Sequence, residues 1–167
     1  MNIELGKNIS PREIETRIQE FWDKNTFWNN DVTSDKTSFC IMMPPPNVTG
    51  SLHMGHAMNN VLTDIVCRYK RMSGFDVLWQ PGTDHASIAT QLLVERDLSK
   101  RGINPHTLSL QEKLDCAWKW KADKGGQIMN QLHILGVTPV WSRERFTMDD
   151  GLSRAVTKLF VKMYNEG

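Results

Sequence analysis

The sequence has no apolar run long enough to cross a membrane. Its uninterrupted hydrophobic stretches are short, whereas a spanning helix needs about 20 such residues. The first residues, Met1-Asn2-Ile3-Glu4, lack the basic and apolar regions of a secretory signal peptide. The sequence therefore predicts a cytoplasmic protein without a membrane partner.

Cysteine is also scarce. Cys40, Cys67 and Cys116 are odd in number, widely spaced and never arranged as Cys-x-x-Cys. This spacing argues against a disulfide framework and against a zinc ribbon. Because free cysteines in a reducing compartment behave as small apolar side chains, we expect three reduced, buried thiols.

An excess of charge of either sign is absent too. The 20 Lys and Arg residues nearly cancel the 19 Asp and Glu residues, so the formal net charge is +1. Composition therefore neither favours nor excludes a nucleic-acid partner. Hydrophobic residues make up 40% and charged residues 23%, which is typical of a globular protein. A length of 167 residues suits one domain and is short for two.

The chain is organised around residues 39–60. An apolar run at 39–43 has the length of a buried strand. Three prolines at 44–46 then stop any regular element, because each lacks an N–H and has a fixed φ. A helix is predicted from about 55 to 73, then a second short strand at 75–79, a turn at 81–84 and a helix at 85–100. This order is a βαβ pattern, which requires parallel strands.

Further helices precede and follow this unit. Ser10, Pro11 and Glu13 predict a helix start with a capping box. A long amphipathic helix is expected at 110–135, followed by an extended connection at 141–146 and a last helix that Thr147 or Asp149 caps. Since two strands are too few for a stable sheet, the chain is expected to be a fragment of a longer protein.

The chemistry-bearing residues follow the first strand, where ligands bind in parallel α/β sheets. His53 and His56 stand at the start of a helix, whose N–H groups and dipole attract phosphate. Two imidazoles there can donate hydrogen bonds to phosphate oxygens as charge develops. Gly55 has no side chain, so an adenine or a ribose can approach the backbone closely.

Other interpretations of these residues remain open. His53 and His56 can be metal ligands together with His85 or Asp84, or simply core or surface histidines. Asp84 can cap the next helix, or it can bind an ammonium group or a ribose hydroxyl from the second turn of the βαβ unit. The three prolines can serve only as a strand terminator, or also as a rigid apolar wall for a small aliphatic group.

Three stretches carry a family resemblance. The first is Pro44-Pro45-Pro46-Asn47-Val48-Thr49-Gly50-Ser51-Leu52-His53-Met54-Gly55-His56-Ala57, the second lies at 78–91 and the third at 141–149. They resemble the HIGH signature, the second crevice loop and the segment before the editing insertion of the class I aminoacyl-tRNA synthetases in their valyl form. Leucyl and isoleucyl enzymes share the scheme, but Pro-Pro-Pro-Asn-Val-Thr-Gly and Gly-Thr-Asp-His-Ala favour the valyl family.

The resemblance implies an α/β fold. Residues 38–167 would form the first half of a Rossmann-like, parallel-sheet, nucleotide-binding catalytic domain that ends near the editing-domain insertion. Residues 1–37 would be an N-terminal helical extension. The implied function is valine–tRNA ligation, in which ATP, accompanied by Mg²⁺, activates valine to valyl-adenylate before transfer to tRNA(Val). The alternatives are a non-catalytic nucleotide-binding module and a metal-dependent hydrolase that uses His53, His56 and His85.

The resemblance also assigns roles to residues. It implies His53 and His56 as catalytic residues that stabilise the phosphates in the activation step. ATP would be bound by Asn47, Thr49, His53, Gly55 and His56. Valine would be bound by Pro44, Pro45, Asn47 and Asp84, with Asp84 on the α-amino group. No protein-bound metal site is expected.

The sequence departs from the family at a few points. Pro139 and Val140 precede Trp141 where an acidic residue is usual, and Ser87 stands where glycine is common. Both changes are expected to affect local packing more than the chemistry. The KMSKS loop, the editing domain and most tRNA-binding regions have no counterpart here, so the fragment alone is expected neither to charge tRNA nor to edit.

Overall fold

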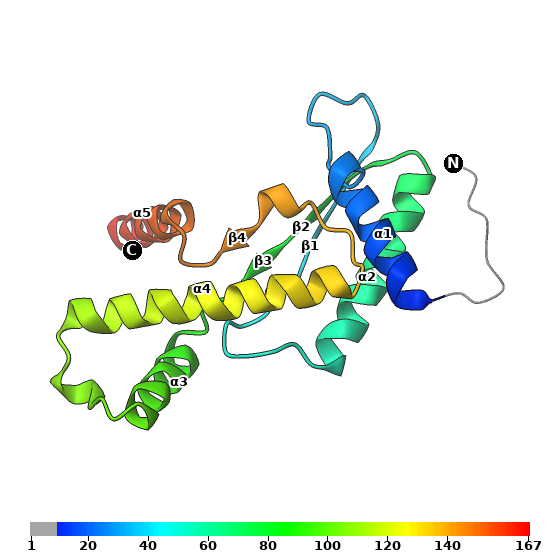
Figure 1. The fold of residues 1–167 in the computed structure, drawn as a ribbon. Coiled ribbons are helices and arrows are strands. Elements are labelled where there is room, and N and C mark those ends of the chain that lie inside the picture. Colours follow the sequence, from blue (N-terminus) through cyan, green and yellow to red (C-terminus); the bar gives the residue numbers. More distant parts are fainter. Residues whose placement is uncertain (1–9) are drawn as a thin grey trace.

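A computed structural model describes residues 10–167 (Figure 1). The first four residues, from which the absence of a signal peptide was predicted, lie outside this range. The order of elements is α1 (Pro11–Asn25), β1 (Ser38–Met42), α2 (Met54–Met72), β2 (Asp76–Gln80), β3 (Gly82–Thr83), α3 (Ser87–Lys100), η1 (Pro105–Thr107), α4 (Leu110–Ile134), η2 (Trp141–Arg143), β4 (Arg145–Phe146) and α5 (Asp150–Glu166).

The predicted βαβ unit is confirmed. β1 pairs with β2 in parallel, in register from Ser38 opposite Asp76 to Met42 opposite Gln80. The connecting helix α2 packs against β2. β2 alternates buried and half-buried side chains, with Trp79 fully buried, whereas β1 alternates half-buried and exposed side chains. Local patterns were sufficient to predict this unit because each of its elements carries its own periodicity and is bounded by its own turn residues.

The predicted turn at 81–84 is wrong. Gly82 and Thr83 form strand β3, which continues the line of β2 and pairs in parallel with β4. Pro81 tolerates this position because its carbonyl still accepts a hydrogen bond from the Arg145 N–H at 3.2 Å. Gly82 is required by the close approach of the strands, since a Cβ there would lie 2.8 Å from the Arg145 carbonyl oxygen. Residues 76–84 therefore run between two parallel neighbours.

The helix boundaries were predicted more accurately than the residues that cap the helices. The start of α1 at Pro11 is confirmed, but Ser10 makes no side-chain cap bond, so the predicted capping box does not form. Asp149 caps α5 by accepting the Leu152 N–H at 2.8 Å. Thr147, the alternative cap, contacts Asp84 instead.

The backbone is left-handed at the start of α3, where Ala86 has a φ of 51° and Ser87 a φ of 41°. Only glycine adopts this region without steric cost. The serine that departs from the family's usual glycine therefore stands at a position where glycine fits better.

The core lies between the sheet, α2 and α4. Its largest fully buried side chains include Met43, Trp79, Ile128 and Leu132. Cys67 belongs to this core, but Cys40 is exposed and Cys116 is partly exposed, so the prediction of three buried thiols is wrong. Cys40 is exposed because it lies on the outer side of β1, where no described element covers the strand.

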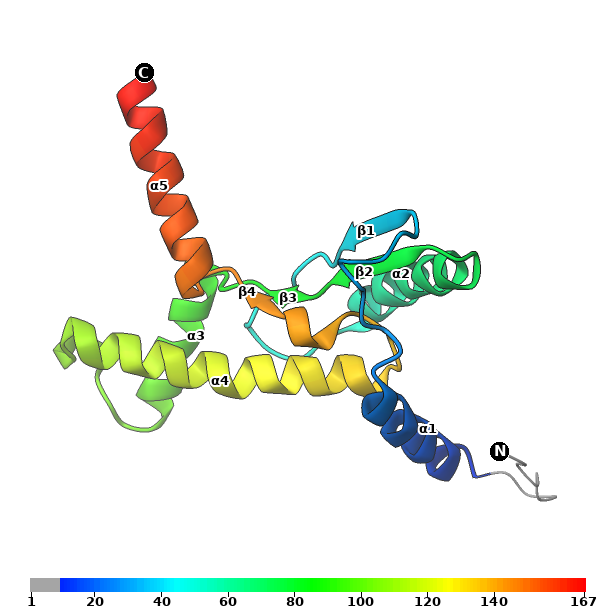
Figure 2. The same ribbon diagram turned by 90° about the horizontal axis from the view of Figure 1, so that it is seen from above.

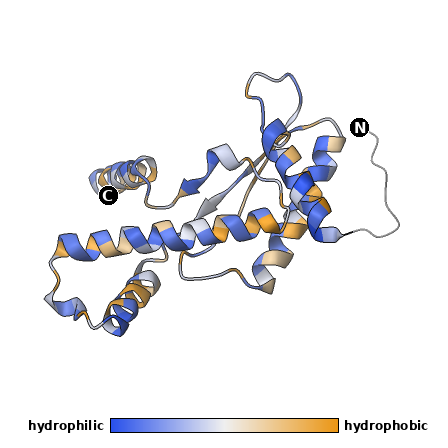
Figure 3. Ribbon diagram, in the orientation of Figure 1, coloured by the Kyte–Doolittle hydropathy of each residue, from blue (hydrophilic) through white to orange (hydrophobic). Residues whose placement is uncertain are grey.

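Helices α2 and α5 each carry several exposed apolar residues. On α2, the apolar side chains Met58, Leu62 and Ile65 are exposed, whereas the residues that α2 buries are Asn60, Asp64 and Cys67. The buried carboxylate of Asp64 accepts hydrogen bonds from Thr138 and Arg68. α5 projects from the body and has no buried residue (Figure 2). Figure 3 shows hydrophobic residues distributed along both helices.

The N-terminal helix α1 is held on the body by aromatic and cationic side chains. The Arg68 guanidinium lies 5.0 Å from the Trp22 ring centroid and 5.3 Å from that of Trp28. Gln19 donates to the His133 carbonyl at the end of α4. Within residues 10–167, no helix combines the length and apolar character that crossing a membrane requires.

Candidate functional site

A backbone bridge brings the two predicted halves of the site together. The Asp84 N–H donates to the Pro46 carbonyl and the Val48 N–H donates to the Asp84 carbonyl, both at 2.9 Å. Asn47 and Asp84 thereby face each other as an isolated parallel bridge. The loops that follow β1 and β3 consequently lie side by side at the carboxyl ends of parallel strands.

The proline corner lies mostly on the surface. Pro44, Pro45 and Asn47 are exposed, Thr49 is half-buried, and Pro46 is buried. Pro44 and Pro45 are thus free to contact a ligand, while Pro46 anchors the corner. None of these positions tests the ligand roles predicted for the residues, which stay predictions.

His53 and His56 cap the helix that they begin. His53 is the N-cap of α2, and its Nδ1 accepts the Gly55 N–H at 3.1 Å. The His56 Nδ1 accepts the His53 N–H at 3.3 Å. The two rings lie 3.9 Å apart between centroids. Because each Nδ1 accepts, each neutral ring carries its proton on Nε2, which remains available to donate to a ligand.

Gly55 is needed by the histidine itself. A Cβ at this position would lie 3.0 Å from Cε1 and 3.1 Å from Nδ1 of His53. An alanine would require the His53 ring to shift by a few tenths of an ångström. The sequence interpretation, in which Gly55 makes room for adenine or ribose, overlooked this closer neighbour.

Burial affects the second histidine. Partial burial lowers the pKa of His56, and the nearby His53 adds a smaller effect in the same direction. Both causes favour the neutral imidazole, because a charge there is less well hydrated and is repelled by a charged neighbour. A neutral His56 is also the form that can accept the His53 N–H.

Helix α4 holds the loop that precedes His53. The Trp120 indole donates to the Val48 carbonyl at 2.8 Å, and the Gln131 side chain accepts the Leu52 N–H, also at 2.8 Å. A third α4 side chain, that of Gln127, donates to the Ser51 hydroxyl at 3.0 Å. Sequence reasoning missed these residues, since their only local signal was that they lie on an amphipathic helix.

Asp84 sits in a small polar network. Its Oδ1 accepts the Ala86 N–H at 3.2 Å and the Thr147 hydroxyl at 3.0 Å. The His85 ring nitrogen Nδ1 lies 3.4 Å from the same oxygen and 2.5 Å from the Thr147 hydroxyl. Asp84 thus does not act as the side-chain cap of α3, whose N-cap is Ala86 and has no side-chain cap bond. Thr147 was also missed, because its sequence position suggested a cap.

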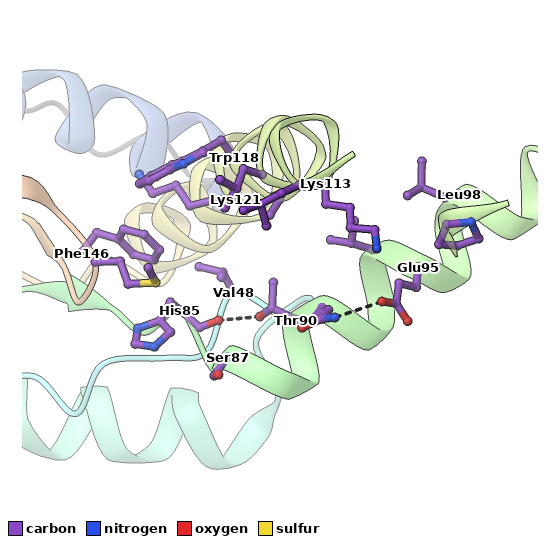
Figure 4. Close-up of a pocket in the computed structure, with 17 residues that line it drawn as sticks. Val48, His85, Ser87, Thr90, Glu95, Leu98, Lys113, Trp118, Lys121 and Phe146 are labelled. Atoms are coloured by element: carbon purple, nitrogen blue, oxygen red, sulfur yellow. Dashed lines mark hydrogen bonds between the residues drawn. The ribbon is translucent and has the colours of Figure 1, made fainter. Parts of the chain in front are cut away.

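An apolar cavity of about 260 Å³ lies beside this network, between α3 and α4 (Figure 4). His85, Val48, Trp118 and Phe146 contribute to its wall. Apart from His85, which was considered as a metal ligand, none of the residues predicted to bind ATP or valine lines it. The cavity is therefore not formed by the prolines at 44–46 or by the two histidines.

No group of three or more His, Cys, Asp or Glu side chains within residues 10–167 is arranged to hold a metal ion. His85 points to Thr147 and Asp84. It does not join His53 and His56 in a set of ligands. The arrangement offers hydrogen-bond donors at the start of α2 and one carboxylate on the neighbouring loop.

Comparisons with known proteins converge on one family. A family model described as tRNA synthetases class I (I, L, M and V) matches residues 17–167. The valine–tRNA ligase of Geobacter sulfurreducens is 53% identical over 164 residues, which are 98% of this chain and 18% of that protein. The valine–tRNA ligase of Syntrophotalea carbinolica is also 53% identical, over 100% of this chain and 19% of that protein.

A solved structure shows the same fold. A LeuRS from Agrobacterium radiobacter K84, crystallised as a ternary complex with tRNA and LeuAMS, superposes with a TM-score of 0.77 and 23% identity. The match covers 96% of this chain and 19% of the LeuRS chain. The chain thus spans slightly less than a fifth of the length of the relatives that it matches.

Proposed function

The chain belongs to the class I tRNA synthetases (I, L, M and V), and on that premise we propose that it supplies one half of the amino-acid-activating site of a valine–tRNA ligase. The proposed reaction joins valine to ATP and then passes the valyl group to tRNA(Val). Residues 38–167 would be the N-terminal half of the Rossmann-like catalytic domain and residues 1–37 its helical extension. The protein would act in the cytoplasm.

One observation carries this proposal. The Asn47–Asp84 bridge sets a lone carboxylate beside the proline corner and the loop that leads to the two histidines. An amino acid needs a carboxylate for its ammonium group and an apolar wall for an aliphatic side chain. ATP needs donors for its phosphates. Asp84 meets the first demand, Pro44 and Pro45 can form the apolar wall, and the start of α2 supplies the donors for phosphate.

The chemistry of activation follows from these groups. A carboxylate oxygen of valine attacks the α-phosphorus of ATP, the bond to the bridging oxygen breaks, and pyrophosphate leaves. Nε2–H groups of His53 and His56 would donate to phosphate oxygens as their charge grows, which by analogy with oxyanion holes is worth roughly 3 kcal/mol per donor. Gly55, Asn47 and Thr49 would line the adenosine side of the cleft, with Asn47 also beside valine.

Mg²⁺ would accompany ATP. Because no cluster of ligating side chains exists in the described part of the chain, we assign the ion to the triphosphate oxygens, where it would neutralise charge. Recognition of tRNA(Val) and hydrolysis of mischarged product would fall mainly to parts of the protein beyond this chain.

The test uses the full-length gene product and valine-dependent exchange of pyrophosphate into ATP. Asp84→Asn should raise the KM for valine by about 100-fold or more, since a buried ammonium loses its charged partner, and should leave the KM for ATP nearly unchanged. Asp97→Asn is the matched control, because Asp97 is a half-exposed aspartate on α3 whose only ion-pair partner within residues 10–167 is Arg101. Exchange that depends on another amino acid, or nucleotide binding without exchange, would overturn the proposal.

A second variant separates catalysis from folding. His56→Glu keeps an acceptor at the position that completes the helix cap, where glutamate is favoured. Its negative charge should however repel the phosphates. We expect unchanged or higher stability together with a fall in kcat of about 100-fold or more. Retained activity in this variant would exclude a phosphate-contacting role for His56.

A further inference from the structure

The Asp84 carboxylate has two oxygens in different surroundings. Oδ1 receives both the Ala86 N–H and the Thr147 hydroxyl. Oδ2 receives no hydrogen bond from any side chain or backbone group within residues 10–167. The carboxylate is therefore held through Oδ1, and Oδ2 remains available to a ligand. Which side chain fixes that orientation depends on the proton positions around Thr147.

The Thr147 hydroxyl has three neighbours and one proton. The His85 N–H donates to it at 2.9 Å, the Asp84 Oδ1 lies 3.0 Å away, and the His85 Nδ1 lies 2.5 Å away. A hydroxyl offers one donor and two acceptor sites. If Nδ1 were unprotonated, it would compete with the carboxylate for the single hydroxyl proton. All three contacts form together only when His85 carries its proton on Nδ1 and the Thr147 hydroxyl donates to Asp84.

The backbone fixes Thr147 in place. Its N–H donates to the Thr83 carbonyl at 3.1 Å, which extends the parallel pairing of β3 and β4 by one residue. Thr147 follows directly after β4 and thus reaches Asp84 from 63 residues further along the chain. Its hydroxyl position is set by the sheet and not by a flexible loop.

We infer that Thr147, with His85 in the Nδ1–H form, is a positioning residue that turns Oδ2 of Asp84 toward the α-amino group of the amino-acid substrate. This inference rests on the proposed function for the identity of the substrate. Thr147 itself does not touch the substrate. It acts through the carboxylate, so its removal should affect only ligands that carry an amino group.

Thr147→Val and Thr147→Ser form the matched pair for the test in the full-length gene product. Valine at this position keeps the shape and removes the hydroxyl, and a lost hydrogen bond to a charged group predicts a rise in the KM for valine of about tenfold or more. Thr147→Ser retains the hydroxyl and should stay within about twofold of the parent. The KM for ATP should not change in either variant.

A ligand without the amino group distinguishes positioning from general damage. The inhibition constant of 3-methylbutanoate, which is valine without its amino group, should be the same in the parent and in Thr147→Val. Equal losses for valine and for 3-methylbutanoate would overturn the inference, because they would mean that Thr147 merely supports the pocket. In an Asp84→Asn background, Thr147→Val should have no further effect.

A measurement without catalysis keeps the inference separate from the proposed function. Nitrogen-15 NMR of the 167-residue chain reports which ring nitrogen of His85 carries the proton. We expect Nδ1–H in the parent and loss of that preference in Thr147→Val. A proton on Nε2 in the parent would refute the network even if valine exchange is found. Conversely, absent exchange with Nδ1–H intact would refute only the proposed function.

Discussion

Trp120 offers the sharpest test of how α4 holds the site. The carbonyl of Val48, a residue that is 1% exposed, accepts the Trp120 indole N–H at 2.8 Å. The N–H of Val48 meanwhile donates to the Asp84 carbonyl. This residue therefore links α4 to the Asp84 loop through its two backbone groups. Trp120→Phe removes the indole N–H while keeping an aromatic ring.

The expected loss follows from the buried carbonyl. Leaving a buried acceptor without a partner costs about 1 to 3 kcal/mol. For a chain of this size that corresponds to a fall in Tm of about 2 to 4 °C for each kcal/mol. Urea unfolding followed by circular dichroism measures the first quantity and a thermal scan the second. Amide exchange in residues 47–56 should also become faster, because the loop loses its tie to α4.

Trp118→Phe is the control. Trp118 lies one half-turn away on the same helix, is 49% exposed, and donates no hydrogen bond from its indole to any group in residues 10–167. Its substitution should cost no more than about 0.5 kcal/mol. Equal losses in the two variants would mean that ring burial stabilises the loop and the hydrogen bond does not. An unchanged Trp120→Phe would refute the link altogether.

Three further outcomes are expected. Ser87→Gly should raise the free energy of unfolding by about 0.5 kcal/mol, because relief of the left-handed φ of 41° outweighs the greater unfolded-state entropy of glycine. The control Ser99→Gly, within α3, should lower the free energy of unfolding by about the same amount. The lowered pKa of His56 means that the unfolded state takes up its proton before the folded state as the pH falls below about 6.5. The free energy of unfolding should therefore fall as the pH drops below that value, and less so in His56→Gln. Burial raises the pKa of the Cys67 thiol to about 11. Iodoacetamide at neutral pH should therefore label exposed Cys40 and leave Cys67 unmodified in the folded chain. Labelling of Cys67 at the same rate as Cys40 would contradict its burial.

The elements whose signals are local could be predicted from the sequence. The strand at residues 39–43, the helix that follows the prolines and the second strand each carry their own periodicity and stop signals, and β1, α2 and β2 confirm them. The apolar stripe of α2 was recognised as well. What the sequence could not show is that this stripe is exposed while Asp64 is buried, since burial depends on which elements pack against the helix.

Pairings across long distances in the sequence could not be predicted. Gly82 and Thr83 look like a turn because Pro81 and Gly82 are typical turn residues. They form a strand because Arg145 and Phe146 pair with them from more than 60 residues away. The same pairing brings Thr147 to Asp84. A missed strand and a missed site residue therefore have one cause.

The spacing of the two histidines has two consequences that sequence reasoning did not separate. A separation of three residues is the separation of an N-cap from the N3 position, so His53 and His56 form a capping box through their Nδ1 atoms. The same spacing leaves both Nε2–H groups for a ligand. Since each imidazole has two distinct nitrogens, the cap and phosphate binding do not compete. Substitution of either histidine by alanine would remove both functions together. A residue that restores only the acceptor, as His56→Glu does, is therefore needed to assign activity to Nε2.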